Sequence, residues 1–368
     1  MTLASAQEVA ALDRAHMIRA LELAAFGLYT TDPNPRVGCV LVRDGVVIGE
    51  GWHVRAGEPH AEVLALRAAA QGARGATAYV TLEPCSHTGR TPPCADALIE
   101  AGVARVVCAE VDPNPKVAGT GIKRLEAAGI TVSSGLQAEA SRTLNCGFFS
   151  RFERGRPFIR LKLAMSLDAR TAAADGARGW ITDEASRRDV QAWRARSSAV
   201  MTGAGTVRAD DPRLDVRLQY GPWVRQPLRV VLDPDLSCAP RSKIFADAHA
   251  LVFAAPDAPP RPALEVRTER VSRAPRGLDL EAVLARLTAL EVNELLVECG
   301  PRLAAAMLEA DLVDELILYV APQFLGMDAP PLASLTGLRP RAFPPRFEFR
   351  EQRLMDNDLR LLLTPRRA

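Results

Sequence analysis

His60, Cys85 and Cys94 are residue types that bind zinc in proteins, and they share one ion only if the chain folds to bring them together. His60 follows Pro59 at the predicted start of a helix. Cys85 comes at the end of a predicted strand, and Cys94 falls in the first turn of a further helix. Helix N-termini lower the pKa of a thiol, so they favour the thiolate that a metal ion needs. The three residues therefore predict a zinc site where a strand end and helix N-termini meet.

Glu62 is predicted to be a catalytic residue rather than a metal ligand. It lies two residues after His60, so it points elsewhere and is free to move protons. One histidine and two thiolates leave an open position for water on the ion, as in catalytic zinc sites. The order histidine–x–glutamate, then Pro-Cys and a second cysteine, is typical of zinc-dependent deaminases. The first part of the chain is thus predicted to be a deaminase that uses one zinc ion.

The spacing between the two cysteines departs from that pattern, in which two residues separate them. Here residues 86–93 lie between Cys85 and Cys94, and we expect them to form a loop that contacts the substrate. Two alternatives stay open at this point. The cysteines could form a disulfide, which a reducing compartment disfavours, or a structural zinc ion could take His87 or Cys39 as a fourth ligand.

The composition points to an ordinary two-domain globular protein. The chain has 368 residues, of which 48% are hydrophobic, and a formal net charge of +2, which gives no reason to expect nucleic-acid or membrane-surface binding. Seven cysteines form no regular disulfide pattern, and Cys108 and Cys146 are predicted to be small core residues. We find neither a signal peptide nor an apolar run long enough to cross a membrane, so we expect a cytoplasmic protein.

Strands alternate with helices along the whole chain, which predicts an α/β architecture. The turn-forming segment around Gly155 marks a boundary, and we expect domains over 1–154 and 155–368. In the first domain we predict helices over 11–26, 59–71 and 92–102, and strands over 37–42, 46–48, 77–82 and 105–109. In the second we predict helices over 184–196, 280–290 and 301–310, strands over 158–164, 199–202, 228–232, 250–254, 294–298 and 316–320, and a surface loop with one short strand over 256–276.

Two glycine-containing segments of the second domain could hold phosphate with backbone amides: residues 202–206 after a strand, and Gly300-Pro301 between a strand and a helix. Neither fits G-x-G-x-x-G, so a Rossmann domain is not predicted. Arginines in the same domain suit a phosphate-bearing ligand, and a solvated charged face is the interpretation we prefer for three of them. Those three are Arg187, Arg188 and Arg196.

Segments of the first domain resemble the bifunctional deaminase–reductases of riboflavin biosynthesis. The run EPCSHTGRTPPC, residues 83–94, is the most specific, and residues 32–38, 60–62 and 112–115 also match. The resemblance implies a cytidine-deaminase-like α/β/α sandwich that deaminates a diaminohydroxy-pyrimidine carrying a ribosylamino 5-phosphate. It also implies substrate contacts at Asn34, His53, Asp112 and Asn114. Ordinary turn chemistry is the alternative for Asn34 and Asn114.

The resemblance extends over the second domain, in residues 162–168, 179–182, 206–212 and 298–301. It implies a dihydrofolate-reductase-like domain that uses NADPH to reduce the ribosyl group of the deaminated product to a ribityl chain. The implied nucleotide contacts are Ala164, Trp180, Thr206, Asp210, Gly300, Pro301, Arg302, Leu303, Ala304, Ala305 and Ala306. The implied substrate contacts are Arg178, Arg194, Leu214, Arg217 and Glu298.

Two positions depart from the family's pattern. Ala169 stands where a glycine is usual, and Arg178 stands where a small polar residue is common, which puts one substrate contact in doubt. Lys162 and Asp168 are the candidates for a general acid in the reductase domain. The resemblance also implies a homo-oligomer, a dimer.

Two other functions fit the sequence less well. A nucleic-acid-editing deaminase should carry a basic stripe and stacking aromatics, but aromatic residues make up only 5% of the chain. A non-catalytic protein stabilised by zinc would not need Glu62 beside an open three-ligand site. The sequence therefore favours the fused deaminase–reductase, acting on a small phosphorylated pyrimidine.

Overall fold

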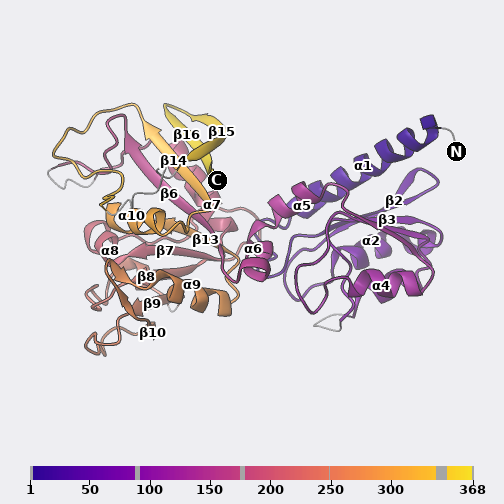
Figure 1. Cartoon of the computed structure of the whole chain (residues 1–368), viewed down its shortest axis with the longest axis horizontal. Helices are drawn as coiled ribbons and strands as arrows, with labels where there is room; N and C mark the ends of the chain where they lie inside the picture. The colour runs from indigo at the N-terminus through magenta and orange to yellow at the C-terminus, as the bar shows by residue number, and fades with distance from the viewer. Residues whose placement is uncertain (1–2, 88–91, 175–178, 248, 337–345, 367–368) are drawn as a thin grey trace. The chain divides into compact units, whose positions relative to one another are not determined.

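A computed structural model describes residues 3–87, 92–174, 179–247, 249–336 and 346–366 of the chain. The chain divides into two compact units, Met1–Gly155 and Arg156–Ala368 (Figure 1). Each unit has its own sheet and its own buried core, so each is described by itself.

The sheet of the first unit has the strand order β2-β1-β3-β4-β5 within the described residues. The strands β2, β1 and β3 pair antiparallel, whereas β3, β4 and β5 are parallel. Their bounds are β1 Gly38–Arg43, β2 Val46–Trp52, β3 Thr77–Val80, β4 Arg105–Cys108 and β5 Thr131–Ser134. The turn at Asp44-Gly45 closes the β1–β2 hairpin with both residues at positive φ, as a tight hairpin turn requires.

Helices cover both faces of this sheet. Because side chains alternate along β1, Cys39 and Leu41 pack with residues of α2, α3 and α4, whereas Val40 and Val42 pack with residues of α1. The helices are α1 Leu3–Ala25, α2 Ala61–Ala69, α3 Cys94–Glu100, α4 Thr120–Ala127, α5 Ala138–Leu144 and α6 Cys146–Arg154, with a short 3₁₀ turn η1 Ala70–Ala73. This is the three-layer sandwich that the resemblance implied.

Close packing of α2 on β2 fixes where the zinc-type ligands lie. A Cβ atom on Gly51 would fall 2.4 Å from the carbonyl oxygen of Ala61, so only glycine lets the start of α2 approach the strand this closely. That contact holds His60, the residue before α2, against the sheet.

The sheet of the second unit has the order β10-β9-β8-β7-β13-β6-β14-β16-β15 (Figure 1). All neighbours from β10 to β14 pair parallel, and the β15–β16 hairpin adds antiparallel to β14. The bounds are β6 Phe158–Ser166, β7 Ala199–Gly203, β8 Leu228–Leu232, β9 Ala250–Ala254, β10 Arg267–Arg270, β13 Glu294–Glu298, β14 Glu315–Ala321, β15 Phe347–Met355 and β16 Asp358–Pro365. A separate small hairpin joins β11 Arg273–Ala274 and β12 Gly277–Leu278.

Two buried clusters lie on the two faces of this sheet. Residues of α9 and α10 pack on one face, and residues of α7 and α8 pack on the other. The helices are α7 Glu184–Arg196, α8 Ala204–Asp210, α9 Leu280–Ala289 and α10 Pro301–Glu309, with a 3₁₀ turn η2 Lys243–Phe245. Asp279 caps α9 by accepting hydrogen bonds from the N–H groups of Glu281 and Ala282.

The predicted strands and helices all occur, most with bounds within a few residues. The sequence did not predict α4, β5, α5, α6, α8, β15 or β16, and it predicted one short strand over 256–276, where the structure has β10 and β11, the latter paired with β12. The pattern of β15 gave no signal because nearly all of its side chains are exposed and many are charged. The described helices include none with the length and hydrophobicity needed to cross a membrane.

Candidate functional site

The first unit gathers the three zinc-type side chains into one cluster. The ligand atoms of His60, Cys85 and Cys94 lie within 4.8 Å of one another. The Nδ1 atom of His60 is 3.2 Å from Cys94 Sγ and 3.6 Å from Cys85 Sγ, and the backbone N–H of Cys94 donates to Cys85 Sγ at 3.3 Å. His60 is the N-cap of α2, and Cys94 is the first residue of α3. An imidazole and two thiols at this spacing form a donor set that suits zinc.

The electrostatics of the cluster favour metal binding. Hydrogen bonds from Cys94 and from His60 hold the pKa of the Cys85 thiol well below its usual range. The hydrogen bond with Cys85 in turn raises the pKa of His60. Cys85 is therefore in the thiolate form that a metal ion requires, and a bound cation would displace the proton from His60.

Glu62 lies beside the cluster with one oxygen unsatisfied. The residue is 3% exposed, and burial raises the pKa of its carboxyl. Its Oε2 atom is buried and has no hydrogen-bond partner within the described part of the chain. Buried polar atoms are normally hydrogen-bonded, so this oxygen is available to accept or share a proton with a bound molecule. The side chain therefore fits a site at which a small polar molecule exchanges protons next to a metal ion.

Asn34 and His53 meet next to the ligand histidine. Asn34 Nδ2 is 3.0 Å from His53 Nε2, and His53 Nδ1 is 3.2 Å from the carbonyl oxygen of Pro59. The rings of His53 and His60 are 5.1 Å apart and meet edge to face. Burial and the neighbouring His60 lower the pKa of His53 to about 4, so its ring is neutral near pH 7. The Asn34 side chain thus does more than complete a local turn.

Asp112 and Asn114 form a turn near Cys85. The backbone N–H of Asn114 donates to Asp112 Oδ1 at 2.8 Å, and Asn114 Oδ1 accepts from the N–H of Lys116 at 3.1 Å. Burial raises the pKa of Asp112 to about 7, and the Cys85 thiolate adds to this rise. The turn chemistry expected for Asn114 is therefore present, and it sets Asp112 within electrostatic reach of the cluster.

The alternatives to a three-ligand site find no support. Cys85 and Cys94 are free thiols, not a disulfide. Within the described ranges, the possible metal-binding group consists of His60, Cys85 and Cys94, and neither His87 nor Cys39 belongs to it. The loop predicted over residues 86–93 lies partly outside the described residues, since 88–91 are not described. Cys108 is buried as predicted, whereas Cys146 is only half-buried at the start of α6.

In the second unit, the two glycine-containing segments come together. The backbone N–H of Gly300 donates to Thr206 Oγ1 at 3.1 Å. Gly300 is the N-cap of α10 after β13, and α8 begins directly after β7. The strands β7 and β13 are parallel neighbours, so both segments lie at the carboxyl ends of adjacent strands. This is the edge of a parallel sheet at which ligands usually bind.

The predicted nucleotide contacts from Gly300 to Ala306 differ in how exposed their side chains are. Arg302 is exposed, whereas Ala304 and Ala305 are fully buried in the core beneath α10. The side chains of the two alanines therefore face the protein. Asp210 is exposed at the end of α8, and Ala164 packs against the buried cluster that includes α7 residues.

Arg194 and Glu298, both predicted as substrate contacts, bond to each other. Arg194 Nε and Nη2 donate to the two carboxylate oxygens of Glu298 at 2.5 and 2.9 Å. Lys162 lies beside them, with its ammonium group 5.7 Å from the ring centre of Tyr319, and burial lowers its pKa. Glu298 therefore has two cationic neighbours, and Lys162 remains a candidate proton donor.

The hydrogen bonds of Asp168 favour a structural role over that of the general acid that the sequence suggested. Its carboxylate accepts hydrogen bonds from Ser166 Oγ and from the backbone N–H groups of Leu325 and Gly326. These bonds lower its pKa to about 2, so it is ionised near neutral pH and holds a turn together. The adjacent Ala169, where glycine is usual, adopts a φ of 58°. That left-handed backbone explains the family's preference for glycine there.

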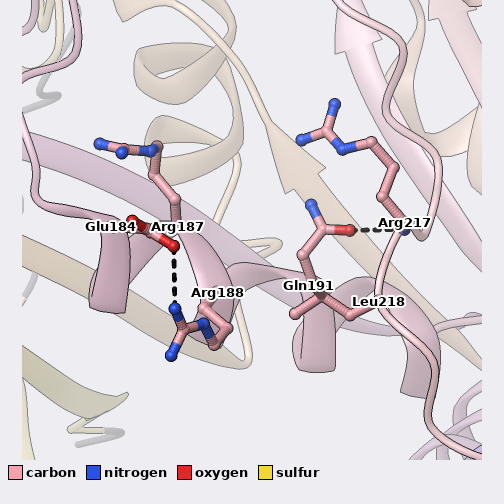
Figure 2. A pocket seen from close by; sticks show the side chains of 6 residues that line it. All are labelled: Glu184, Arg187, Arg188, Gln191, Arg217 and Leu218. Atoms are coloured by element: carbon pink, nitrogen blue, oxygen red, sulfur yellow. Dashed lines mark hydrogen bonds and ion pairs between the residues drawn. The ribbon is translucent and has the colours of Figure 1, made fainter.

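A shallow pocket lies along α7 and contains Arg217 (Figure 2). The Arg217 backbone N–H donates to Gln191 Oε1 at 2.8 Å, while its guanidinium extends away from that contact (Figure 2). Arg187 lies on the other side of Gln191, so two cationic side chains flank one amide. The full lining is Glu184, Arg187, Arg188, Gln191, Arg217 and Leu218.

The solvated face predicted for three arginines is correct only for Arg188. Arg188 is exposed and pairs with Glu184. Arg187 is half-buried, and its guanidinium carbon lies 5.0 Å from the ring centre of Trp180, which is 76% exposed. Arg196 pairs with the fully buried Glu294 at 3.0 Å. The helical periodicity of α7 could have indicated that Arg187 is partly buried, because Arg187, Gln191 and Arg194 recur every three to four residues and so share one face of the helix.

Neither Leu214 nor Arg178 is placed by the structure as an open substrate contact. Leu214 is buried in the core at a φ of 54°, so its side chain packs against the protein rather than toward solvent. Arg178 lies outside the described residues.

Comparison with known proteins matches each unit to a family. Residues 11–110 match "Cytidine and deoxycytidylate deaminase zinc-binding region", a span that includes His60, Glu62, Cys85 and Cys94. Residues 157–361 match "RibD C-terminal domain". The riboflavin biosynthesis protein RibD of Escherichia coli K12 is 50% identical, over 95% of this chain and 99% of the relative.

The chain belongs to the RibD family. A solved structure of Acinetobacter baumannii RibD is 44% identical and superposes with a TM-score of 0.91, covering 97% of this chain and 100% of that one. A Thermotoga maritima structure is 34% identical with a TM-score of 0.85, covering 97% and 99%. Its name describes a diaminohydroxyphosphoribosylaminopyrimidine deaminase and 5-amino-6-(5-phosphoribosylamino)uracil reductase. RibD proteins are the bifunctional deaminase–reductases of riboflavin biosynthesis, so the predicted family and fold class are confirmed.

Proposed function

We propose that this chain catalyses two successive reactions. The first is zinc-dependent hydrolytic deamination of 2,5-diamino-6-(5-phosphoribosylamino)pyrimidin-4-one. The second is NADPH-dependent reduction of the ribosyl group of the product, 5-amino-6-(5-phosphoribosylamino)uracil, to ribityl. The observation that carries the first reaction is the unpartnered, buried Oε2 atom of Glu62 beside His60, Cys85 and Cys94.

In the deamination, His60, Cys85 and Cys94 hold one zinc ion per chain. Zinc, when bound, lowers the pKa of water so that a nucleophile is available at neutral pH. Glu62 accepts one proton of the attacking water and delivers it to the ring nitrogen. It then takes the proton of the new hydroxyl group on the attacked carbon and gives it to the amine, so that the C–N bond breaks, ammonia departs and a carbonyl remains. The raised pKa of Glu62 suits this work, because the side chain must both accept and donate protons. Asn34, His53, Asp112 and Asn114 bind the pyrimidine.

In the reduction, the carboxyl ends of β7 and β13 bind the nucleotide through Thr206 and the first turn of α10. NADPH, when bound, supplies a hydride. The hydride adds to the ribosyl carbon that carries the amine, and a proton is delivered to the ring oxygen as the ring opens. Lys162 is the proposed source of that proton, because burial lowers its pKa while the charge of the nearby Glu298 favours its protonated form. Glu298 and Arg194 shape the substrate side of the site.

The pocket along α7 supports a phosphorylated substrate. Arg217 and Arg187 line it from two different segments, and arginine forks bind phosphate through paired hydrogen bonds (Figure 2). Arg188 is held by Glu184, so it contributes less positive charge to the pocket. We therefore place the substrate 5-phosphate between Arg187 and Arg217. The dimeric assembly and the cytoplasmic location expected from the sequence belong to the same proposal.

One incubation series tests the proposal. Pure protein receives the diaminopyrimidine phosphate with NADPH, with NADH or with no nucleotide, and ammonia release and nucleotide oxidation are followed separately. We expect ammonia in all three arms and oxidation of NADPH only after ammonia appears. Protein treated with a zinc chelator should release no ammonia but should still oxidise NADPH when given the deaminated product. Ammonia release that survives complete zinc removal would contradict the deaminase mechanism.

A further inference from the structure

Glu83 is a buried carboxylate that neither proposed reaction uses. It lies between β3 and Cys85, is 4% exposed, and both of its oxygens are fully engaged. Oε1 accepts from the backbone N–H groups of Gly121 and Ile122 at 2.9 and 3.1 Å. Oε2 accepts from the N–H groups of Gly119 and Asp112 at 2.9 and 3.3 Å. One side chain therefore holds four backbone amides of a segment that follows it by about thirty to forty positions.

The segment that Glu83 holds carries the proposed substrate contacts. Asp112 is bound directly, and Asn114 follows in the turn that Asp112 closes. Beyond it, Gly119 and Gly121 begin α4, whose free N–H groups would otherwise lack partners. A carboxylate at a helix N-terminus is also favoured by the helix dipole. The same side chain thus caps α4 and fixes the position of Asp112.

The packing around Glu83 leaves the segment little freedom. A Cβ atom on Gly121 would fall 1.9 Å from the carbonyl oxygen of Pro84, so α4 starts directly on the backbone that precedes Cys85. Ser86 Oγ lies 2.6 Å from Thr120 Oγ1, and Arg124 pairs with Asp96 at 2.5 Å, two residues after Cys94. The helix α4 is therefore joined to both cysteine-bearing segments.

We propose that Glu83 is a positioning residue of the deaminase site, which acts through Asp112. By holding the 112–122 segment against the Cys85 segment, it sets the distance between the substrate-binding turn and the metal ligands. The metal ligands themselves do not depend on it, because no hydrogen bond of its carboxylate reaches them. This inference rests on the proposed deaminase function.

The test is Glu83→Gln in the full chain. The amide keeps the shape, but its NH₂ group faces two backbone N–H donors and leaves them unpaired. We expect KM for the pyrimidine to rise at least about tenfold, which is the effect of losing roughly one charge-assisted contact. The change in kcat should be smaller. Zinc content and the reductase rate on deaminated product should be unchanged. Glu110→Gln is the matched control, since the Glu110 carboxylate contacts the N–H of Val111 and the Arg142 side chain, and the substitution leaves its backbone bond to Glu83 in place. The KM of this control should stay within about twofold.

Two further variants keep the inference open to refutation. Gly119→Ala adds a methyl group where there is open space, but the φ of 76° at this position strains any residue with a Cβ. The substitution should therefore raise KM, as Glu83→Gln does, without altering charge. In an Asp112→Asn background, the effect of Glu83→Gln on KM should shrink, because both act through one turn.

Loss of zinc from Glu83→Gln, an unchanged KM, or effects that add fully to those of Asp112→Asn would each overturn the positioning role. If instead the unaltered protein released no ammonia, the proposed function would fail rather than this inference. Should Glu83→Gln prove insoluble, an unchanged KM in Gly119→Ala would overturn the inference by itself.

Discussion

Arg194 of α7 and Glu298 at the end of β13 form a two-point ion pair across 104 positions of sequence, with N–O distances of 2.5 and 2.9 Å. Both side chains are nearly buried, at 10% and 11% exposure. Arg194 also donates to the carbonyl oxygen of Asp215, two residues before Arg217. The pair therefore ties α7 to the end of β13, and each group holds the other in place.

Removing one partner of this pair should destabilise the protein more than removing both. Glu298→Leu leaves the Arg194 charge buried and unpaired, which costs about 3–5 kcal/mol, whereas Arg194→Met with Glu298→Leu should recover most of that loss. Neither variant should retain reductase activity. Urea unfolding followed by tryptophan fluorescence measures the stabilities. Glu184→Gln, which breaks an exposed ion pair on the same helix, should change stability by less than about 0.5 kcal/mol. A double variant as unstable as Glu298→Leu would argue against this account.

Glu62→Gln should keep its zinc and lose deamination. The amide cannot accept the water proton, and general acid–base groups contribute about 10²- to 10⁴-fold to rate. Elemental analysis and ammonia release under saturating substrate measure the two properties. Glu58→Gln is the matched control, because Glu58 is half-buried and pairs with Arg55 at 2.8 Å. Deamination near the unaltered rate in Glu62→Gln would remove the assigned role.

The sequence alone supported much of the deaminase site and less of the reductase site. The zinc-type ligands could be predicted because their residue types are rare and their positions at a strand end and at helix starts have a chemical reason. Thr206 and Gly300 could be linked to one site because parallel strands end at a common edge. The pairing of Arg194 with Glu298 could not, since no local pattern reveals which buried charge meets which across a sheet.

Other features depend on geometry that the sequence does not display. Ala304 and Ala305 follow Gly300 in a matching segment, and the rotation of α10 turns their side chains into the core. Glu83 stands within the most specific motif, but its role depends on four backbone amides that the sequence does not mark. The sequence identifies chemistry carried by side chains more readily than chemistry carried by the backbone.

Asp13 should make the first unit sensitive to acid. Arg105 donates to both oxygens of Asp13 at 2.9 and 2.6 Å, Tyr79 adds a hydrogen bond, and the Arg105 bond lowers the pKa of Asp13. A lowered folded pKa means that the stabilisation is complete above the unfolded value, near pH 4, and disappears as pH falls through the folded value. Asp13→Asn should therefore cost roughly 1–2 kcal/mol near pH 7 and progressively less below about pH 4. Thermal unfolding of both proteins across that range measures the difference, and a gap that stays constant with pH would contradict it.

A fragment from Arg156 to Ala368 should fold and reduce without deaminating. It coincides with the second compact unit, and it keeps the Arg156–Asp314 ion pair at 2.7 Å. The residues proposed to bind NADPH and the substrate of the reduction all lie within it, so NADPH binding should not require the zinc domain. Circular dichroism reports folding, and titration with NADPH and with deaminated product reports binding. A folded fragment that binds no nicotinamide nucleotide would exclude the reductase assignment.

The same fragment tests the phosphate pocket. Arg217→Ala should weaken binding of the deaminated product about ten- to hundredfold and leave NADPH affinity unchanged, because one charge-assisted contact is worth about 1.5–3 kcal/mol. Arg213→Ala is the matched control: Arg213 is 55% exposed, pairs with Asp215 and does not line the pocket. The unphosphorylated nucleoside should bind equally to the fragment and to its Arg217→Ala variant, since the lost contact serves the phosphate. An equal loss for both ligands would place Arg217 against the ring or the ribose instead.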